Sequence, residues 1–196
     1  MDYTTSALVK TAIGTSATTD DTQIAKLVTA VSRAMDRKMA GAVKSDDYLK
    51  SESVSAEAGR GLVGSDGIIH YWARKPLVTA VSAFSYNYSP IEAALTVATS
   101  YIKVDGYQIM AYTSAARGRP FVTVSYTGGL AASQAALPED VIEAATVLTV
   151  RYYKEVKGGL SDSIGVAELG TLIYTKAWPV RVLDLLTPYM RRQPIW

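Results

Sequence analysis

Apolar residues recur at spacings of three and four along two N-terminal segments, a spacing typical of amphipathic helices. The first segment covers residues 6–13 and is followed by Gly14, which suits a helix C-terminus. The second follows Asp20 and Asp21, whose carboxylates favour a helix N-terminus, and continues to about Met39. We therefore predict a short helix followed by a long one.

Two further helices are predicted in the C-terminal third of the chain. One begins at Leu137-Pro138-Glu139-Asp140, with proline at the first helical position and acids in the first turn. The other begins at Pro179, again at the first helical position, and is stopped by Pro188. Between them, residues 160–176 are punctuated by glycine, and we expect a short strand at residues 172–175.

The middle of the chain changes character part-way. Residues 42–66 are polar and show no period, so we predict a long loop or an extension of the surface. Runs rich in Val, Ile and Tyr follow and predict strands, and Asp105-Gly106 between two of them is a strong hairpin signal. The predicted strands cover residues 68–72, 77–84, 94–98, 101–104, 107–112 and 120–126.

These elements predict an α+β fold. Residues 1–41 and 130–188 would form a small antiparallel helical bundle, and residues 42–129 would form a polar loop plus a β-rich insertion between the long helices. Residues 189–196 would form an extended C-terminal arm. A chain of 196 residues with 48% hydrophobic residues is large enough to bury a real core.

The C-terminal arm is hydrophobic at a place where chains usually fray. Burying Trp196 alone would cover ~150–250 Å², which corresponds to ~4–6 kcal/mol before ordering costs are subtracted. Such a tail either folds back onto its own domain or docks on a partner, and we favour docking. The docking residues would be Tyr189, Met190, Arg191, Arg192, Pro194, Ile195 and Trp196.

Charge and composition restrict the partners. Twenty basic and 18 acidic residues give a net charge of +2, spread along the chain, so the polybasic footprint of a nucleic-acid-binding protein is missing. The absence of cysteine excludes disulfide scaffolds, thiolate catalysis and Cys-ligated zinc. No apolar run approaches the ~20 residues of a membrane span, and the N-terminus lacks signal-peptide regions. We expect a protein that has no membrane partner and is not exported by a standard signal.

No motif points convincingly to catalysis. Gly59, Gly61 and Gly64 have the G-x-G-x-x-G spacing, but the dinucleotide fingerprint needs a preceding strand and a following helix, which are not predicted here. His70 is the only histidine, and a Ser-His-Asp hydrolase around it lacks a nucleophile-elbow motif. Helix capping explains Asp20-Asp21. We predict no catalytic, cofactor-binding or metal site.

Arg117 and Arg119 lie in the predicted loop of residues 113–119, between two strands. Basic residues in such a position are candidates for contact with DNA phosphates or with a partner protein. A solvated hairpin tip is the alternative explanation.

Four segments of the chain, taken in order, are similar in sequence to a known protein family. They are the N-terminal helix pair through Asp36, the strand entry Arg74-Lys75-Pro76-Leu77-Val78-Thr79-Ala80-Val81, the run from Val122 to Tyr153, and the closing helix with its ending Leu185-Leu186-Thr187-Pro188-Tyr189-Met190-Arg191-Arg192. In this order they resemble the head-to-tail connector, or adaptor, proteins of tailed double-stranded DNA bacteriophages. The polar residues 42–66 and the length of the β insertion depart from the shorter family members.

The resemblance implies a structural virion protein, not an enzyme, that forms an adaptor ring beneath the portal and helps complete the filled head. Copies would assemble side by side as a dodecamer, with double-stranded DNA passing through the lumen without sequence-specific binding. The partners implied are the portal protein, neighbouring copies, and a tail or stopper protein. The implied location is the virion neck, after synthesis in the host cytoplasm. The alternatives are another neck or tail-completion protein of the stopper type, and the His70 hydrolase.

Overall fold

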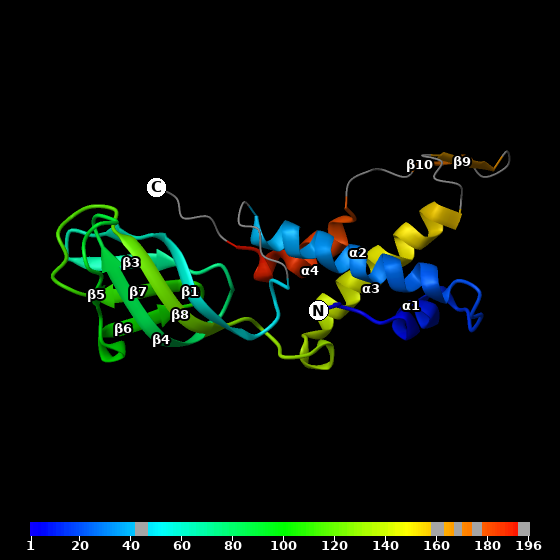
Figure 1. The fold of residues 1–196 in the computed structure, drawn as a ribbon. Coiled ribbons are helices and arrows are strands. Elements are labelled where there is room, and N and C mark those ends of the chain that lie inside the picture. The colour runs from blue at the N-terminus through cyan, green and yellow to red at the C-terminus, as the bar shows by residue number, and fades with distance from the viewer. Residues whose placement is uncertain (42–46, 158–162, 167–169, 174–177, 192–196) are drawn as a thin grey trace. The chain divides into compact units, whose positions relative to one another are not determined.

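The computed structural model describes residues 1–41, 47–157, 163–166, 170–173 and 178–191 of the chain (Figure 1). The fold is α+β, which confirms the class predicted from the sequence. The chain divides into two compact units. The helical unit comprises Met1–Ala42 and Gln134–Trp196, and the β unit comprises Val43–Ser133.

Both N-terminal helices form where the apolar spacing predicts them. The side chain of Thr5 caps the first helix by accepting a hydrogen bond from the backbone N–H of Leu8. Gly14 ends this helix with a φ of 80°, a left-handed conformation that glycine adopts without steric cost. The bounds are Ser6–Ile13 for α1 and Asp21–Ala40 for α2.

Both C-terminal helices also form, but in each the proline predicted at the first helical position lies directly before the helix. The first of them begins at Glu139, after Pro138. Pro179 precedes the last helix as its N-cap, because its ψ of 136° is extended, so its predicted place at the first helical position is wrong. The strand expected at residues 172–175 overlaps a short antiparallel hairpin, and residues 174 and 175 lie outside the described residues. The bounds are Glu139–Lys157 for α3, Ser163–Val166 for β9, Gly170–Ile173 for β10 and Val180–Leu186 for α4, with 3₁₀ turns at Gln134–Ala136 (η2) and Thr187–Tyr189 (η3).

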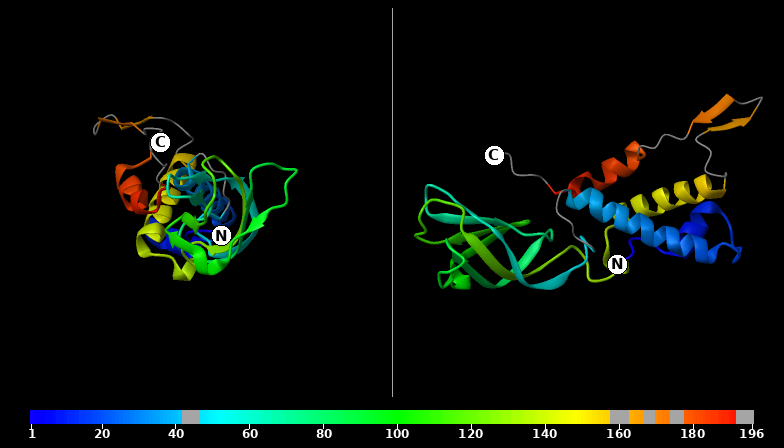
Figure 2. Two further views of the ribbon diagram at one scale, coloured as in Figure 1. Left: turned by 90° about the vertical axis from the view of Figure 1, so that its left-hand side faces the viewer. Right: turned by 45° about the horizontal axis from the view of Figure 1, so that its top comes forward.

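The helical unit is held together by packing of α2 against α3, of α1 against both, and of α4 against α3 (Figure 2). Val9, Ile24 and Val28 are buried between these helices. Asp20 adds a polar contact, since its carboxylate accepts hydrogen bonds from Lys157 Nζ and Tyr153 Oη, both at 2.7 Å. The bond from Lys157, followed by that from Tyr153, holds the pKa of Asp20 below its usual range. Apolar and charged contacts therefore join the same helices.

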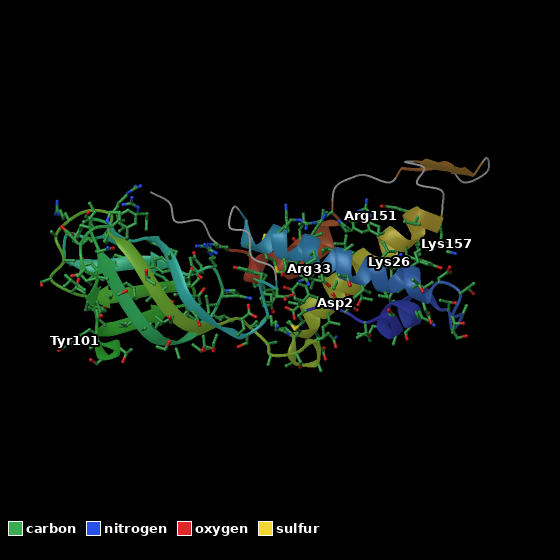
Figure 3. All side chains as sticks on the ribbon, in the orientation of Figure 1. Asp2, Lys26, Arg33, Tyr101, Arg151 and Lys157 are labelled. Atoms are coloured by element: carbon green, nitrogen blue, oxygen red, sulfur yellow. The ribbon has the colours of Figure 1, made fainter. Side chains whose placement is uncertain are left out.

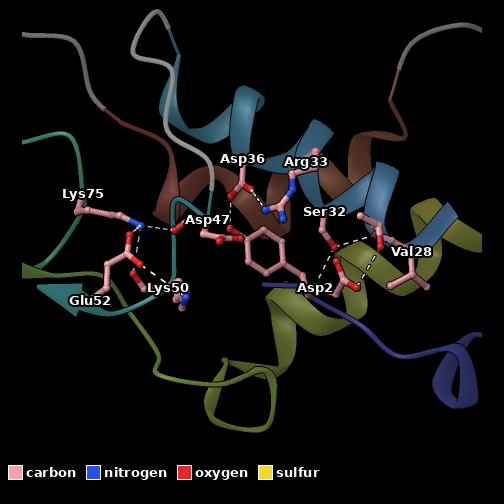
Figure 4. Close-up of polar contacts among 11 residues, drawn as sticks. Asp2, Val28, Ser32, Arg33, Asp36, Asp47, Lys50, Glu52 and Lys75 are labelled. Carbon is pink, nitrogen blue, oxygen red and sulfur yellow. Dashed lines mark hydrogen bonds and ion pairs between the residues drawn. The ribbon is translucent and has the colours of Figure 1, made fainter. Parts of the chain in front are cut away.

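The residues before α1 are anchored on α2. Tyr3 is fully buried, its backbone N–H donates to Ser32 Oγ at 2.9 Å, and its hydroxyl donates to the Asp36 carboxylate. Arg33 Nη1 lies 3.4 Å from Asp36 Oδ2, so it pairs with the same carboxylate (Figure 4). Asp2 accepts a hydrogen bond from the Thr29 hydroxyl at 3.1 Å. The first residues of the chain are thus part of the helical core.

The β unit consists of two four-stranded antiparallel sheets. The strand order is β1-β8-β4-β5 in the first sheet and β2-β3-β7-β6 in the second. Both sheets contribute to one apolar core, in which Phe84, Val124, Ile69 and Ile109 are fully buried. The bounds are Glu52–Arg60 for β1, Leu62–Val63 for β2, Ile68–Trp72 for β3, Val78–Asn87 for β4, Leu95–Thr96 for β5, Ile102–Asp105 for β6, Gln108–Tyr112 for β7 and Phe121–Gly128 for β8, with a 3₁₀ turn at Thr99–Tyr101 (η1).

All six predicted strands of the β unit are present, and the predicted hairpin joins β6 to β7. Asp105 pairs with Gln108, so the two-residue turn is Gly106-Tyr107, one residue later than the predicted Asp105-Gly106. Gly106 has a φ of 60°, which this type of turn requires. Local turn chemistry therefore located the hairpin correctly to within one residue.

The predicted loop at residues 42–66 is wrong, because β1 and β2 lie within it. β1 is the outermost strand of its sheet, and most of its side chains are exposed or half-buried. Its one buried residue is a carboxylate, Glu57. The buried position of this strand is charged, and its few apolar residues, such as Val54, do not alternate regularly with polar ones. The strand therefore lacks the hydrophobic period that would have revealed it in the sequence.

Glu57 organises the buried polar contacts of the β unit. Its carboxylate accepts hydrogen bonds from Tyr71 Oη at 2.8 Å, from Tyr126 Oη at 2.6 Å and from the backbone N–H of Arg74 at 3.1 Å. Burial, and then the Glu57 carboxylate, raises the pKa of both tyrosine hydroxyls, which keeps them protonated as donors. Because Tyr71 is on β3 and Tyr126 is on β8, this carboxylate links the two sheets.

A second polar cluster surrounds Lys75, which is 5% exposed. Its ammonium group donates to the carbonyl of Asp47 at 2.6 Å and pairs with the Glu52 carboxylate at 2.7 Å (Figure 4). Lys50 approaches the same carboxylate at 3.6 Å. The hydrogen bond from Lys75 holds the pKa of Glu52 below its usual value of 4.5. This cluster fastens the start of the β unit to the entry of β4.

Replacing Glu57 with alanine should lower the free energy of unfolding by about 3 kcal/mol, because the buried hydroxyls of Tyr71 and Tyr126 lose their acceptor. Urea-induced unfolding followed by tryptophan fluorescence measures the change. Glu92→Ala, which removes an exposed carboxylate from the same unit, is the matched control and should change stability by less than about 0.5 kcal/mol. Equal losses in the two variants would contradict a special role for Glu57.

The ion pair of Glu52 with Lys75 should make stability depend on pH. Because the folded pKa of Glu52 is lowered, its stabilising contribution is present above pH 4.5 and is lost as the pH falls through the folded pKa. Thermal unfolding of the wild type and of Glu52→Gln should therefore differ most at pH 6 and converge at low pH, on the order of pH 3. A difference in melting temperature that persists unchanged into acid would contradict this assignment.

Candidate functional site

The last helix, α4, packs against α3 and so attaches the C-terminal segment to the helical unit. Val182 and Leu186 are fully buried, and Arg181 pairs with Glu143 of α3 at the surface. The 3₁₀ turn of η3 follows directly, because Thr187 caps α4 and Pro188 cannot continue the helix. This arrangement brings the first residues of the predicted arm, Tyr189 to Arg191, onto the helical unit.

The first three predicted docking residues, Tyr189, Met190 and Arg191, are half-buried on their own unit. Tyr189 Oη donates to Asp140 Oδ2 at 3.2 Å, and the backbone N–H of Arg191 donates to the carbonyl of Met39 at 2.8 Å. Burial, and then Asp140, raises the pKa of the Tyr189 hydroxyl. The chain is thus held between the end of α2 and the start of α3. The remaining docking residues, Arg192, Pro194, Ile195 and Trp196, lie outside the described residues, so the docking arm stays a prediction.

Arg117 and Arg119 are both exposed, in the loop between β7 and β8. The loop is tied down by two residues from elsewhere in the β unit. Arg60 Nη1 donates to the carbonyl of Arg119 at 3.0 Å, and the Tyr88 hydroxyl donates to the carbonyl of Ala116. The two arginine side chains therefore project from a supported backbone.

Sequence reasoning missed Arg60 and Tyr88 as neighbours of this loop. The guanidinium carbon of Arg60 lies 3.5 Å from the centre of the Phe121 ring, a stacked cation–π arrangement that leaves the edge of the guanidinium available. Arg60 ends β1 and Tyr88 follows β4, so both are far from the loop in the sequence. No local pattern could have joined them to Arg117 and Arg119.

A sequence profile described as "Head completion protein" matches residues 2–192. The chain belongs to the head completion protein family. No curated protein matches the chain.

Solved structures of gene transfer agent (GTA) particles contain similar chains. One, titled "Neck of empty GTA particle computed with C6 symmetry", has 16% identity and a TM-score of 0.52, over 97% of this chain and 90% of that chain. A second, "Virion of native gene transfer agent (GTA) particle", has 16% identity and a TM-score of 0.49, over 91% and 82%. The first of these likenesses shows a shared fold.

The predicted alternatives for catalysis find little geometric support in this head completion protein. Gln108 Nε2 lies 2.8 Å from His70 Nδ1, so an amide occupies the place where a catalytic triad needs a carboxylate. Close packing explains why glycine occupies positions 59 and 61. An added Cβ would come within 2.9 Å of the Tyr71 ring at Gly59 and within 2.9 Å of the Ile69 side chain at Gly61. Among the described residues, no three His, Asp or Glu side chains are grouped to hold a metal ion. None of the helices in the described part of the chain has the length and apolarity needed to cross a membrane.

Tyr189→Phe should lower the free energy of unfolding by about 1 kcal/mol, because the Asp140 carboxylate loses a partly buried donor. Tyr112→Phe, at an exposed tyrosine of the β unit, is the control and should have almost no effect. Urea-induced unfolding of both variants measures the difference. No loss in Tyr189→Phe would show that the described start of the arm is not fastened by this bond.

Proposed function

We propose that this protein is a structural component of the neck of a tailed phage or phage-like particle, where it forms an adaptor ring beneath the portal. The ring would join the DNA-filled head to the tail and leave a channel for DNA passage. The match of residues 2–192 to the head completion protein family carries the proposal. The fold shared with a chain in a GTA particle neck supports it, as does the ordered resemblance to connector proteins.

The C-terminal arm would bind the portal. Its described start is fastened on the helical unit through Tyr189 and Arg191, so residues 192–196 begin from a fixed point. Fixing one end of a segment lowers the entropy lost when the segment docks. Each arm needs only modest affinity, because a ring presents many arms to a symmetric partner at once. The neighbouring partners would be further copies of the chain and a tail or stopper protein.

Arg117 and Arg119 would supply a weaker contact, to a partner protein or to DNA phosphates. Two exposed arginines on a supported loop suit phosphate contact. A net charge of +2 over the whole chain suits DNA that must slide through without being held. Sequence-specific DNA binding is not part of this proposal.

A stopper-type or tail-completion protein remains the second candidate, because membership of the head completion family fits either level of the neck. Electron microscopy of assembled necks distinguishes the two. An adaptor lies directly on the portal, whereas a stopper lies further from the head. A density for this chain that is separated from the portal by another protein would replace the adaptor proposal with the second candidate.

Deleting residues 193–196 should weaken binding to the purified portal protein by on the order of tenfold or more, because Trp196 and Ile195 lose their docking contacts. Surface-immobilised portal and soluble variants of the full chain measure the affinity. Tyr112→Ala, which removes an exposed aromatic side chain from the β unit, is the control and should bind as the wild type does. Unchanged binding after the deletion would exclude the arm as the portal contact.

A further inference from the structure

Exposed apolar side chains concentrate on the connection from β4 to β6. Tyr88, Ile91, Leu95 and Tyr101 are 39%, 95%, 59% and 62% exposed. Figure 3 shows Tyr101 at the margin of the β unit. Glu92 is the only charged residue between Tyr88 and Tyr101. A concentration of this kind on a protein surface indicates an interaction site.

The loop that carries Ile91 is already ordered. The Asn87 side-chain amide donates to the carbonyls of Ser89 at 2.8 Å and Glu92 at 3.2 Å, and the Glu92 N–H donates to the Ser89 carbonyl at 3.1 Å. These bonds close the loop on itself. A partner that meets it therefore has little ordering cost to overcome.

The same surface contains the free edge of a sheet. β5 is the outermost strand beyond β4, and Val97 N–H donates inward to the Phe84 carbonyl at 2.9 Å. Because inward and outward peptide groups alternate along a strand, the N–H and C=O of Thr96 face away from β4. An exposed edge with apolar neighbours is suited to the addition of another strand.

The opposite edge of this sheet is β1, and it also has peptide groups that face outward and could pair with those of β5. The N–H of Gly61, just after β1, donates inward to the Pro120 carbonyl at 2.9 Å, so by the same alternation the peptide groups of Ala58 and Arg60 face outward. The register of β1 is interrupted between Val54 and Glu57, where Ala56 has a φ of 50°. This bulge limits the regular free edge to the end of β1.

The two free edges are in register across the sheet. Ala58 pairs with Thr123, Thr123 with Ser85, and Ser85 with Thr96, so these four residues form one row. All three strand pairs are antiparallel, and β5 therefore runs antiparallel to β1. If the sheet continues in line into another copy, Thr96 meets Ala58 with both peptide groups directed at each other.

We propose that β5 of one copy pairs with the end of β1 of the next copy, so that the first sheet continues from subunit to subunit around the ring. Charge supports a second copy as the occupant. With Thr96 opposite Ala58, Ala94 just before β5 lies opposite Arg60. Glu92, in the loop two residues before Ala94, then belongs to the same end of the contact as Arg60. Within the described part of the chain, the Glu92 carboxylate forms no ion pair, and the contacts of Arg60 are with Phe121 and the Arg119 carbonyl.

This contact joins two different patches of the same chain, so repeating it generates a ring when the rotation closes. It rests on the proposed function for the existence of a ring. Each contact involves only a few residues. The surface area that it buries is therefore far below the about 800 Å² per partner of a stable binary complex. The contact therefore belongs to an assembly that closes on itself or on the portal, where many weak contacts act together.

The absence of cysteine from the chain allows a direct test. In the proposed pair the Cα atoms of residues 58 and 96 would lie about 5.5 Å apart, within the range that a disulfide spans. Under mild oxidation in the presence of portal protein, the double variant Ala58→Cys with Thr96→Cys should give a ladder of covalent multimers beyond the dimer. A mixture of the two single variants should give dimers only, and each single variant alone should give none. The matched control pair, Ala58→Cys with Lys103→Cys on β6, should give no ladder.

Electron microscopy of the same samples separates the outcomes. A ring on the portal without a ladder overturns this contact and leaves the proposed function intact. Dimers from either single variant alone indicate a two-fold contact and overturn the head-to-tail pairing. If no ring forms on the portal, the proposed function fails, and oxidation of the concentrated protein alone decides the contact: a ladder supports it, and the absence of one overturns it.

Discussion

The β unit depends on one buried carboxylate. Glu57 accepts hydrogen bonds from Tyr71 in one sheet and Tyr126 in the other, and it is itself part of β1. Burying an unpaired carboxylate would cost several kcal/mol, and the two hydroxyls together with the N–H of Arg74 offset this cost. Because the carboxylate needs all of these donors at once, it specifies how the two sheets face each other and where β1 lies.

The position of β1 has consequences for the surface of the unit. Once β1 is fixed along β8, the first sheet has β1 at one edge and β5 at the other, and their residues fall into shared rows. The same strand ends in Arg60, which supports the loop of Arg117 and Arg119 through a carbonyl. A buried polar contact therefore determines the geometry of two surfaces that are available for binding. The proposed function is one of recognition, and such supported surfaces are what recognition requires.

Each of the proposed contacts is small. The arm would contribute a few residues and the sheet edge a few more, and neither would hold a stable complex alone. Assembly with a symmetric partner changes this, because every copy contributes the same contacts and none can leave without breaking several. Weak contacts would also allow misplaced copies to dissociate before the proposed ring closes. This is a physical reason for a head completion protein to use short, preorganised contacts.

The helices and most strands of this protein were predictable because their signals are local. Thr5 and Gly14 delimit α1, and the two-residue turn at Gly106 joins β6 to β7. The apolar spacing of α2 and α3 indicates which face of each helix is buried, even when the element that packs against it is unknown. The ordered segments that resemble connector proteins led to the correct family for the same reason.

β1 was missed because it is stabilised by contacts with residues far away in the sequence. Only the folded chain brings Glu57 to Tyr126, 69 positions away, and only then does a polar segment become a strand. The same holds for Arg60 beneath the loop of Arg119, and for the pairing row from Ala58 to Thr96. The sequence by itself determined the helices, most strands and the family, since periodicity, caps and turns act between near neighbours. The tertiary structure alone decided which polar side chains are buried and which strand edges stay free, because both depend on contacts between residues far apart in the chain.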